Sequence, residues 1–109
     1  MQPKFNLWLE ADGEVVFSAW RAVLLQTVRD TGSISAAAAK LGVQYRTAWQ
    51  KINEMETRLG VKLVDTQIGG QHGGGARLTP AALDYLDKFN RLNTALEGTV
   101  NATFRQTFG

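Results

Sequence analysis

Polar side chains that could read DNA bases recur at helical spacing in the middle of the chain. The steps are four, three and four residues, from Arg46 through Gln50 and Asn53 to Thr57, so all four lie on one face of a helix. Arginine, glutamine and asparagine form paired hydrogen bonds with base edges in the major groove. The spacing therefore predicts a surface that recognises the sequence of duplex DNA.

A glycine-rich run follows, holding five of the eleven glycines between positions 69 and 75. Its spacing is not that of a P-loop, because Gly74 precedes Gly75 and Ala76 instead of Lys and Ser or Thr, and it does not fit a dinucleotide fingerprint. Backbone without side chains can approach phosphates and donate N–H groups to them. We interpret the run as a hairpin tip on the DNA backbone, with a ligand-free solvent loop as the alternative. Its residues are Gly69, Gly70, Gln71, His72, Gly73, Gly74 and Gly75.

Metal binding and enzymatic catalysis find no support in the residue types. The chain has no cysteine and one histidine, His72, which we interpret as a polar residue of the loop tip. Asp84 and Asp87 are three residues apart on a helix, but nothing near them suggests a pocket, so a solvated surface is the better interpretation. With no pairing of nucleophile and base, we predict a protein that is not an enzyme and needs no metal or cofactor.

Length and charge agree with a small DNA-binding unit. The 109 residues fit one domain, residues 1–109. Residues 33–79 hold six Lys and Arg against three Asp and Glu, while the flanking segments are close to neutral. A basic middle suits a polyanionic partner. No apolar stretch approaches a membrane span and no signal peptide is visible, so we expect a soluble cytoplasmic domain without a membrane partner.

A hairpin and a first helix should precede the polar face. Residues 1–17 are predicted to form a β-hairpin that turns at Asp12-Gly13, because this dipeptide accepts positive φ at both positions. Ser18 can cap a helix through about Thr31, ended by Gly32. We expect the two tryptophans of this region to lie in the core. They are Trp8 and Trp20.

Residues 18–60 are predicted to form three helices. The second and third of these, over residues 35–59, are predicted to form a helix-turn-helix. Ser35 can cap a short alanine-rich helix that Gly42 ends. The next helix, from about Tyr45 to Leu59, buries one stripe opposite the polar face and stops at Gly60. A short helix, a tight turn and a polar-faced helix are typical of DNA-binding proteins. The alternative is an ordinary helical hairpin in a bundle.

A second hairpin and a last helix complete the chain. Residues 61–78 are predicted to form two short strands around the glycine run, and Thr79-Pro80 opens a helix over 79–98. Its apolar face is too wide for one small domain, so we expect part of it to bury a second copy of the chain. Residues 99–109 have no clear period and should fray. The predicted dimer contacts are Leu83, Leu86, Phe89, Leu92 and Leu96.

Residues 32–66 and 69–82 resemble a known family. The segments SISAAA (33–38), YRTAW (45–49) and LTP (78–80), with the glycine run before the last, are similar to the LysR-type winged helix-turn-helix. Within that type they resemble the amino-terminal DNA-binding domain of the ModE group of molybdate-responsive regulators. The resemblance covers about residues 5–97. Gln44 departs from it, because the pattern usually has a serine cap there.

The resemblance implies a mainly α fold with small β elements: a winged helix-turn-helix with an N-terminal β-hairpin, a glycine-rich wing and a long C-terminal dimerisation helix. It implies a homodimeric transcription regulator on a palindromic operator. The helix at 45–59 would enter the major groove and the wing would cross the backbone. The chain ends near the start of the family's molybdate-binding domains, so we expect no molybdate sensing here, and a sensor domain or protein would be separate.

We assign two sets of DNA contacts on this basis, with a protein–protein interaction module as the rival function. The residues expected to read bases are Tyr45, Arg46, Thr47, Trp49, Gln50 and Asn53. The residues expected to hold phosphates, with the glycine run, are Ser35, Lys40, Lys51, Arg58, Lys62 and Arg77.

Overall fold

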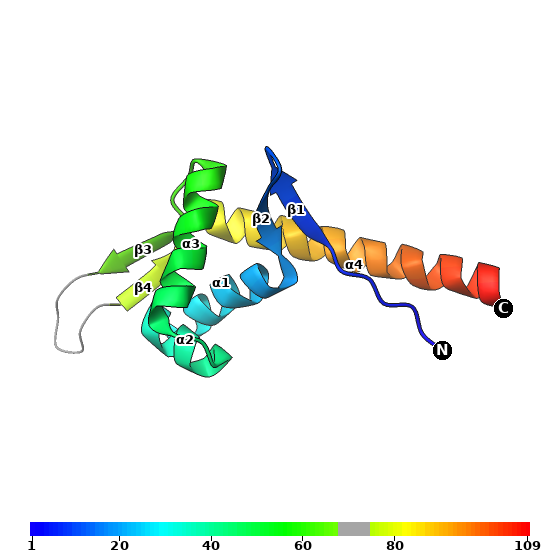
Figure 1. The fold of residues 1–109 in the computed structure, drawn as a ribbon, viewed down its shortest axis with the longest axis horizontal. Helices are drawn as coiled ribbons and strands as arrows, with labels where there is room; N and C mark the ends of the chain where they lie inside the picture. Colours follow the sequence, from blue (N-terminus) through cyan, green and yellow to red (C-terminus); the bar gives the residue numbers. More distant parts are fainter. Residues whose placement is uncertain (68–74) are drawn as a thin grey trace.

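The computed structural model describes residues 1–67 and 75–109, which form four helices and two small hairpins. Three helices make the body, and the second half of the last helix projects away from it along the 59 Å axis (Figure 1). None of the helices in these residues is long and apolar enough to cross a membrane. The elements are β1 (Trp8–Ala11), β2 (Glu14–Ser18), α1 (Ala19–Thr31), α2 (Ile34–Leu41), α3 (Tyr45–Leu59), β3 (Val64–Gln67), β4 (Gly75–Leu78) and α4 (Pro80–Phe108).

The first hairpin turns where the dipeptide predicted. Asp12 and Gly13 have φ of 53° and 79°, and Ala11 pairs with Glu14 across them. Two positive φ values in a two-residue loop match the right-handed twist of the flanking strands. The strands β1 and β2 are antiparallel, with a register shift between Leu9 and Glu10.

Short-range signals set most helix ends. The hydroxyls of Ser18 and Thr79 accept the backbone N–H three residues on, at 3.2 and 3.1 Å, and so cap α1 and α4. Helices α1, α2 and α3 each end at a left-handed glycine, with φ of 79° at Gly32, 71° at Gly42 and 70° at Gly60. The helix-turn-helix predicted from these signals is formed by α2 and α3.

One predicted cap is wrong. Ser33, not Ser35, caps α2: its Oγ accepts the N–H of Ala36 at 2.9 Å. The earlier start brings Ile34 into the helix and buries it in the core. Ser35 lies exposed in the first turn.

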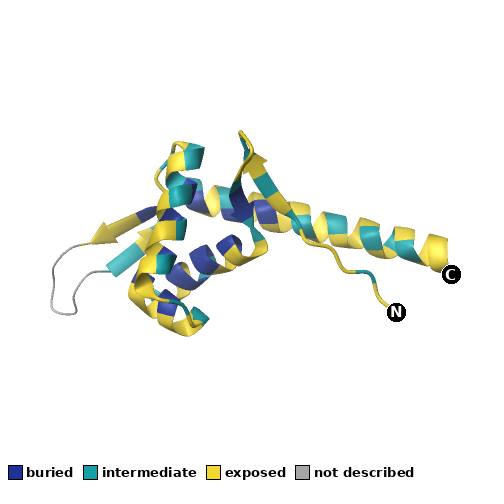
Figure 2. Cartoon of the chain, viewed as in Figure 1, coloured by how far each residue is buried: buried dark blue, intermediate teal, exposed yellow. Residues whose placement is uncertain are grey.

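The core forms where the three helices of the body, the first hairpin and the start of α4 meet (Figure 2). Leu24, Leu25 and Met55 are fully buried between the helices. Phe17 of β2 reaches the start of α4, where its ring lies 5.3 Å from that of Phe89 and 6.2 Å from that of Tyr85. This contact joins the hairpin to α4.

The two tryptophans expected in the core lie at the surface. Trp8 and Trp20 are 49% and 38% exposed. The buried face of α1 passes through Arg21 and Leu24 instead, so Trp20 points outward. Trp8 donates its indole N–H to a carboxylate oxygen of Glu10 at 2.8 Å.

The prediction for the last helix, α4, is wrong at its C-terminal end. The helix continues to Phe108 instead of ending near Gly98, so residues 99–108 are helical and not frayed. Val100 and Phe104 extend the apolar spacing by two turns, and the rings of Phe104 and Phe108 stack at 5.0 Å. The apolar spacing, although weak, therefore continues beyond Gly98, and so does the helix.

Candidate nucleic-acid interface

The outer face of α3 presents the predicted polar side chains to solvent. Arg46, Gln50 and Asn53 are exposed, and behind them Ala48 and Ile52 are buried. Burial on one side fixes the rotation of the helix, so the polar side must point outward.

Three other predicted base readers lie at the edges of this face. Tyr45 and Trp49 are 54% and 48% exposed, and Thr47 is half-buried. Gln44, which departs from the resemblance, makes no side-chain hydrogen bond as the cap of α3. No side chain caps the first N–H groups of α3, and Arg46 lies in its first turn. The positive end of the helix dipole and the arginine charge therefore lie close together.

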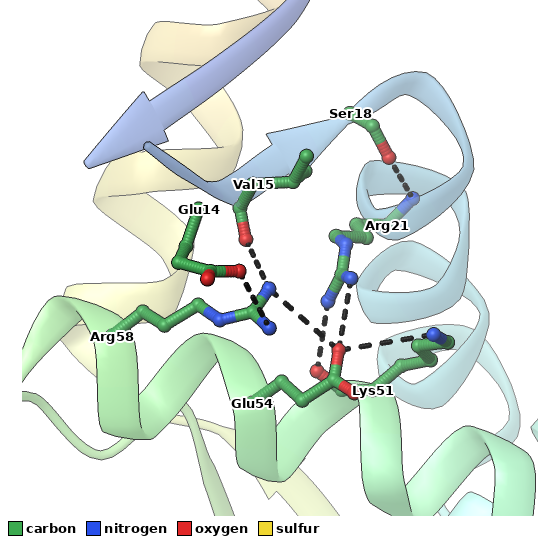
Figure 3. A network of polar contacts seen from close by, with 7 residues as sticks. All are labelled: Glu14, Val15, Ser18, Arg21, Lys51, Glu54 and Arg58. Carbon is green, nitrogen blue, oxygen red and sulfur yellow. Dashed lines mark hydrogen bonds and ion pairs between the residues drawn. The ribbon is translucent and has the colours of Figure 1, made fainter. Parts of the chain in front are cut away.

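One flank of α3 is tied to α1 by a buried arginine that sequence reasoning missed (Figure 3). Arg21 donates to the carbonyl oxygen of Lys51 at 3.1 Å and to Glu54 Oε2 at 3.0 Å. Lys51 Nζ lies 3.8 Å from the same carboxylate oxygen. A charged residue on the apolar stripe of α1, three positions before Leu24, was the available signal.

Arg58 belongs to the same network and not to the open surface. Its Nη1 donates to the carbonyl oxygen of Val15 at 2.7 Å, and its Nη2 lies 3.3 Å from Glu14 Oε2 (Figure 3). Nη1 is also 3.8 Å from Glu54 Oε2. The guanidinium thus holds the first hairpin against α3, in place of the phosphate contact predicted for it.

The cations around Glu54 lower the pKa of its carboxyl below the ordinary 4.5, first through the hydrogen bond from Arg21 and then through Lys51 and Arg58. Because the folded pKa is the lower one, this carboxylate stabilises the fold above about pH 4.5. The contribution is lost as the pH falls through the lowered value. We expect the difference in unfolding free energy between wild type and Glu54→Gln to be constant near pH 7 and to shrink below pH 4.5 in urea titrations. A difference that stays unchanged between about pH 4.5 and about pH 3 would contradict this.

The other flank of α3 is tied to the start of the second hairpin. Glu56 Oε2 accepts the backbone N–H groups of Leu63 at 2.8 Å and Val64 at 3.1 Å. Its Oε1 lies 3.9 Å from Lys62 Nζ, an ion pair in which the lysine remains exposed. A pocket opens beside this contact, lined by Ile34, Trp49, Ile52, Asn53, Glu56, Lys62, Val64 and Thr66.

The hairpin of β3 and β4 lies next to the turn between α1 and α2. The strands are antiparallel, with Asp65 opposite Arg77, and Arg77 is exposed. The N–H of Ala76 donates to the carbonyl oxygen of Gly32 at 2.8 Å, which links β4 to the turn between α1 and α2. Of the glycine run, Gly75 starts β4, while Gly69, Gly70, Gln71, His72, Gly73 and Gly74 lie outside the described residues.

The remaining predicted contacts divide between surface and core. Ser35 and Lys40 are exposed on α2. On α4, Leu83 and Leu92 are each 41% exposed and Leu96 is half-buried. Two predicted dimer contacts are wrong, since the core of the chain itself buries them on the side of α4 that faces Phe17. They are Leu86 and Phe89, each 3% exposed.

Comparison with known sequences gives consistent matches. Residues 21–83 match the family described as bacterial regulatory helix-turn-helix protein, lysR family. Transcriptional regulator ModE of Yersinia pestis is 39% identical over 79 residues, 72% of this chain and 30% of that protein. Molybdenum-pterin-binding protein MopB of Rhodobacter capsulatus is 46% identical over 63 residues, 58% of this chain and 23% of that protein. The chain thus spans less than a third of the length of these relatives.

A solved structure shares the fold. The chain aligns with the CbnR DBD, solved as a complex with DNA, at a TM-score of 0.60 and 23% identity. The alignment covers 83% of this chain and 97% of the other. The architecture is therefore a winged helix-turn-helix with a long last helix, mainly helical with two small hairpins.

Proposed function

The chain belongs to the lysR family of bacterial regulatory helix-turn-helix proteins, and from that premise we propose that it regulates transcription by binding a palindromic operator as a homodimer. The observation that carries the proposal is the outer face of α3, where Arg46, Gln50 and Asn53 are exposed on a helix anchored on its other sides. Related proteins of this fold have been solved with DNA, among them the CbnR and BenM DBDs. The activity is DNA binding and not catalysis.

In the proposed complex α3 enters the major groove. Arg46, Gln50 and Asn53 read base edges, and Tyr45, Thr47 and Trp49 contact bases or sugars at the margins. A base-reading helix must be held at a fixed rotation, which the contacts of Glu54 and Glu56 on its two flanks supply.

Phosphate contacts surround this helix in the proposal. They supply affinity that does not depend on sequence and that weakens as salt rises. The hairpin of β3 and β4 acts as the wing. The described residues assigned to phosphates are Ser35, Lys40, Lys51, Lys62, Gly75 and Arg77.

Selection of bound duplexes from a random pool tests the function. We expect enrichment of one inverted repeat, with binding to it that weakens steeply between about 50 and 200 mM salt. No enriched sequence at either salt would refute base reading, and it would favour the rival function in which this face binds a protein.

The dimer contact is proposed on the projecting half of α4. Leu92 is 41% exposed, and Leu96, Val100 and Phe104 are half-buried along the same side. This half of the helix leaves the body of the molecule and contains Gly98 (Figure 1). A glycine inside an exposed stretch of helix costs about 1 kcal/mol relative to alanine, a loss that packing against a second copy would offset.

Truncation of Leu92 should weaken the dimer. The side chain has about half of its surface left to bury, so Leu92→Ala should cost about 1 kcal/mol per copy, or roughly 30-fold in the dimer dissociation constant. Alanine keeps the helix propensity high. Sedimentation equilibrium would measure the change, with Thr94→Ala, at an exposed position on the other side of α4, as the matched control. Equal dissociation constants for both variants would place the interface elsewhere.

Any effector would act through a separate sensor in this proposal. The similarity to ModE and MopB covers less than a third of those proteins, and we assign no molybdate site to these residues. The cytoplasm is the compartment that such a regulator requires.

A further inference from the structure

A carboxylate lies unexpectedly close to the surface proposed to meet DNA. Glu56 is on the side of α3 that carries Trp49, and its side chain is 16% exposed. A negative charge near phosphates is unfavourable unless other groups compensate it. The groups that surround this carboxylate therefore indicate what it does.

One oxygen of Glu56 holds the backbone where the wing begins. Oε2 accepts the N–H of Leu63 and the N–H of Val64, the first residue of β3. Both residues are buried, at 0% and 2% exposure, so these N–H groups have poor access to water. Loss of the acceptor would leave two buried donors without that partner, which is costly enough to shift the backbone.

The carbonyl groups of the same segment are held by Thr79, the residue that caps α4. Thr79 donates its hydroxyl to the carbonyl oxygen of Lys62 at 2.7 Å and its N–H to that of Leu63 at 3.0 Å. Residues 62–64 are thus held on one edge by Glu56 of α3, the proposed recognition helix, and on the other edge by Thr79. Glu56 is the member of this set that lies on α3.

Glu54 is the natural comparison, two residues earlier on the same helix. Its partners, Arg21, Lys51 and Arg58, lie on α1 and α3, on the flank away from the wing. A change at Glu54 should therefore disturb the attachment of α3 to α1 and leave the wing in place.

We propose that Glu56 is a positioning residue that sets the angle between the recognition helix and the wing, so that Arg77 meets a phosphate while α3 occupies the major groove. This inference rests on the proposed function. The inference depends on the contact of one carboxylate oxygen of α3 with the N–H groups of Leu63 and Val64, where β3 begins.

A double-mutant cycle between Glu56 and Arg77 tests the inference on the selected operator. Arg77→Ala should weaken binding about fivefold in wild type, as expected for one lost phosphate contact. In a Glu56→Leu background the same change should cost less than about twofold, because the displaced wing no longer makes the contact. Fluorescence anisotropy would give the affinities, and thermal melting would show that each variant is folded.

Three further variants separate positioning from charge and from stability. Glu56→Gln should keep the full effect of Arg77→Ala, whatever its own affinity, since a single oxygen accepts both N–H groups and glutamine supplies one. Glu54→Gln should keep the full effect of Arg77→Ala. Glu56→Asp replaces Glu56→Leu in the cycle if the leucine variant does not fold. Its side chain is one methylene shorter, so the effect of Arg77→Ala should fall about twofold or more.

The possible outcomes are distinct. An undiminished effect of Arg77→Ala in the Glu56→Leu or Glu56→Asp background would overturn the inference, as would a Glu56→Gln variant that matches Glu56→Leu. Operator binding by wild type without any effect of Arg77→Ala would refute the wing contact alone. Failure of wild type to bind duplex DNA would refute the proposed function itself.

Discussion

Replacement of Phe17 by alanine should lower the free energy of unfolding by about 3–5 kcal/mol. The side chain is 1% exposed and packs against Tyr85 and Phe89 of α4. Its removal leaves a cavity and also breaks the aromatic contact between the first hairpin and α4. Domains of this size have about 5–15 kcal/mol of stability, so the variant should lose a large fraction of it.

Urea titration of wild type and Phe17→Ala would measure this loss. Phe108→Ala is the matched control, because that phenylalanine is 64% exposed at the end of α4. We expect it to change stability by less than about 0.5 kcal/mol. A Phe17→Ala loss below about 1 kcal/mol would mean that the hairpin is not part of the cooperative core, given the typical range of such truncations.

Arg46→Ala should cost about 1–3 kcal/mol per half-site and should relax the base preference at the position that it reads. The side chain is exposed on the outer face of α3, next to a helix start without a side-chain cap. Arg46→Lys should lose most of the preference as well, because lysine keeps the charge and lacks the planar fork of two donors. Competition between the operator and single-base variants of it would measure the preference.

Lys40→Ala provides the contrast for Arg46. The lysine is exposed on α2 and is assigned to a phosphate, so its loss should weaken all sequences alike and lower the salt slope by about one. Intact discrimination in Arg46→Ala, at whatever affinity, would show that Arg46 does not read a base.

The elements that sequence predicted well are those set by neighbours in the chain. A turn dipeptide or a helix cap depends only on contacts within three or four residues along the chain. The structure has the turn at Asp12-Gly13 and the caps at Ser18 and Thr79 where they were predicted. Ser33 and Ser35 are equally good caps, and the choice between them depends on burial of Ile34, which is a tertiary effect. The continuation of α4 to Phe108 likewise lacked a strong local signal.

The candidate site divides in the same way. The periodicity of α3 predicted its outer face, since burial of Ala48 and Ile52 requires it. The contacts that hold α3 in place could not be predicted, because they join residues far apart in sequence. Arg58 reaches Val15 across 43 residues and Arg21 reaches Glu54 across 33. Arg58 looks like a surface residue when only composition and spacing are considered. The place of Arg21 on the apolar stripe of α1 suggests burial but does not identify its partner.

The direct passage from the wing into α4 has a consequence for operator architecture. Leu78 ends β4 and Pro80 starts α4, so two copies joined along their last helices would hold their wings and recognition helices at a separation set by the alignment of those helices. A slip of one helical turn is about 5.4 Å, or about one and a half base pairs at roughly 3.4 Å each. Substitutions in the projecting half of α4 would then alter the number of base pairs between half-sites without touching any residue that meets DNA.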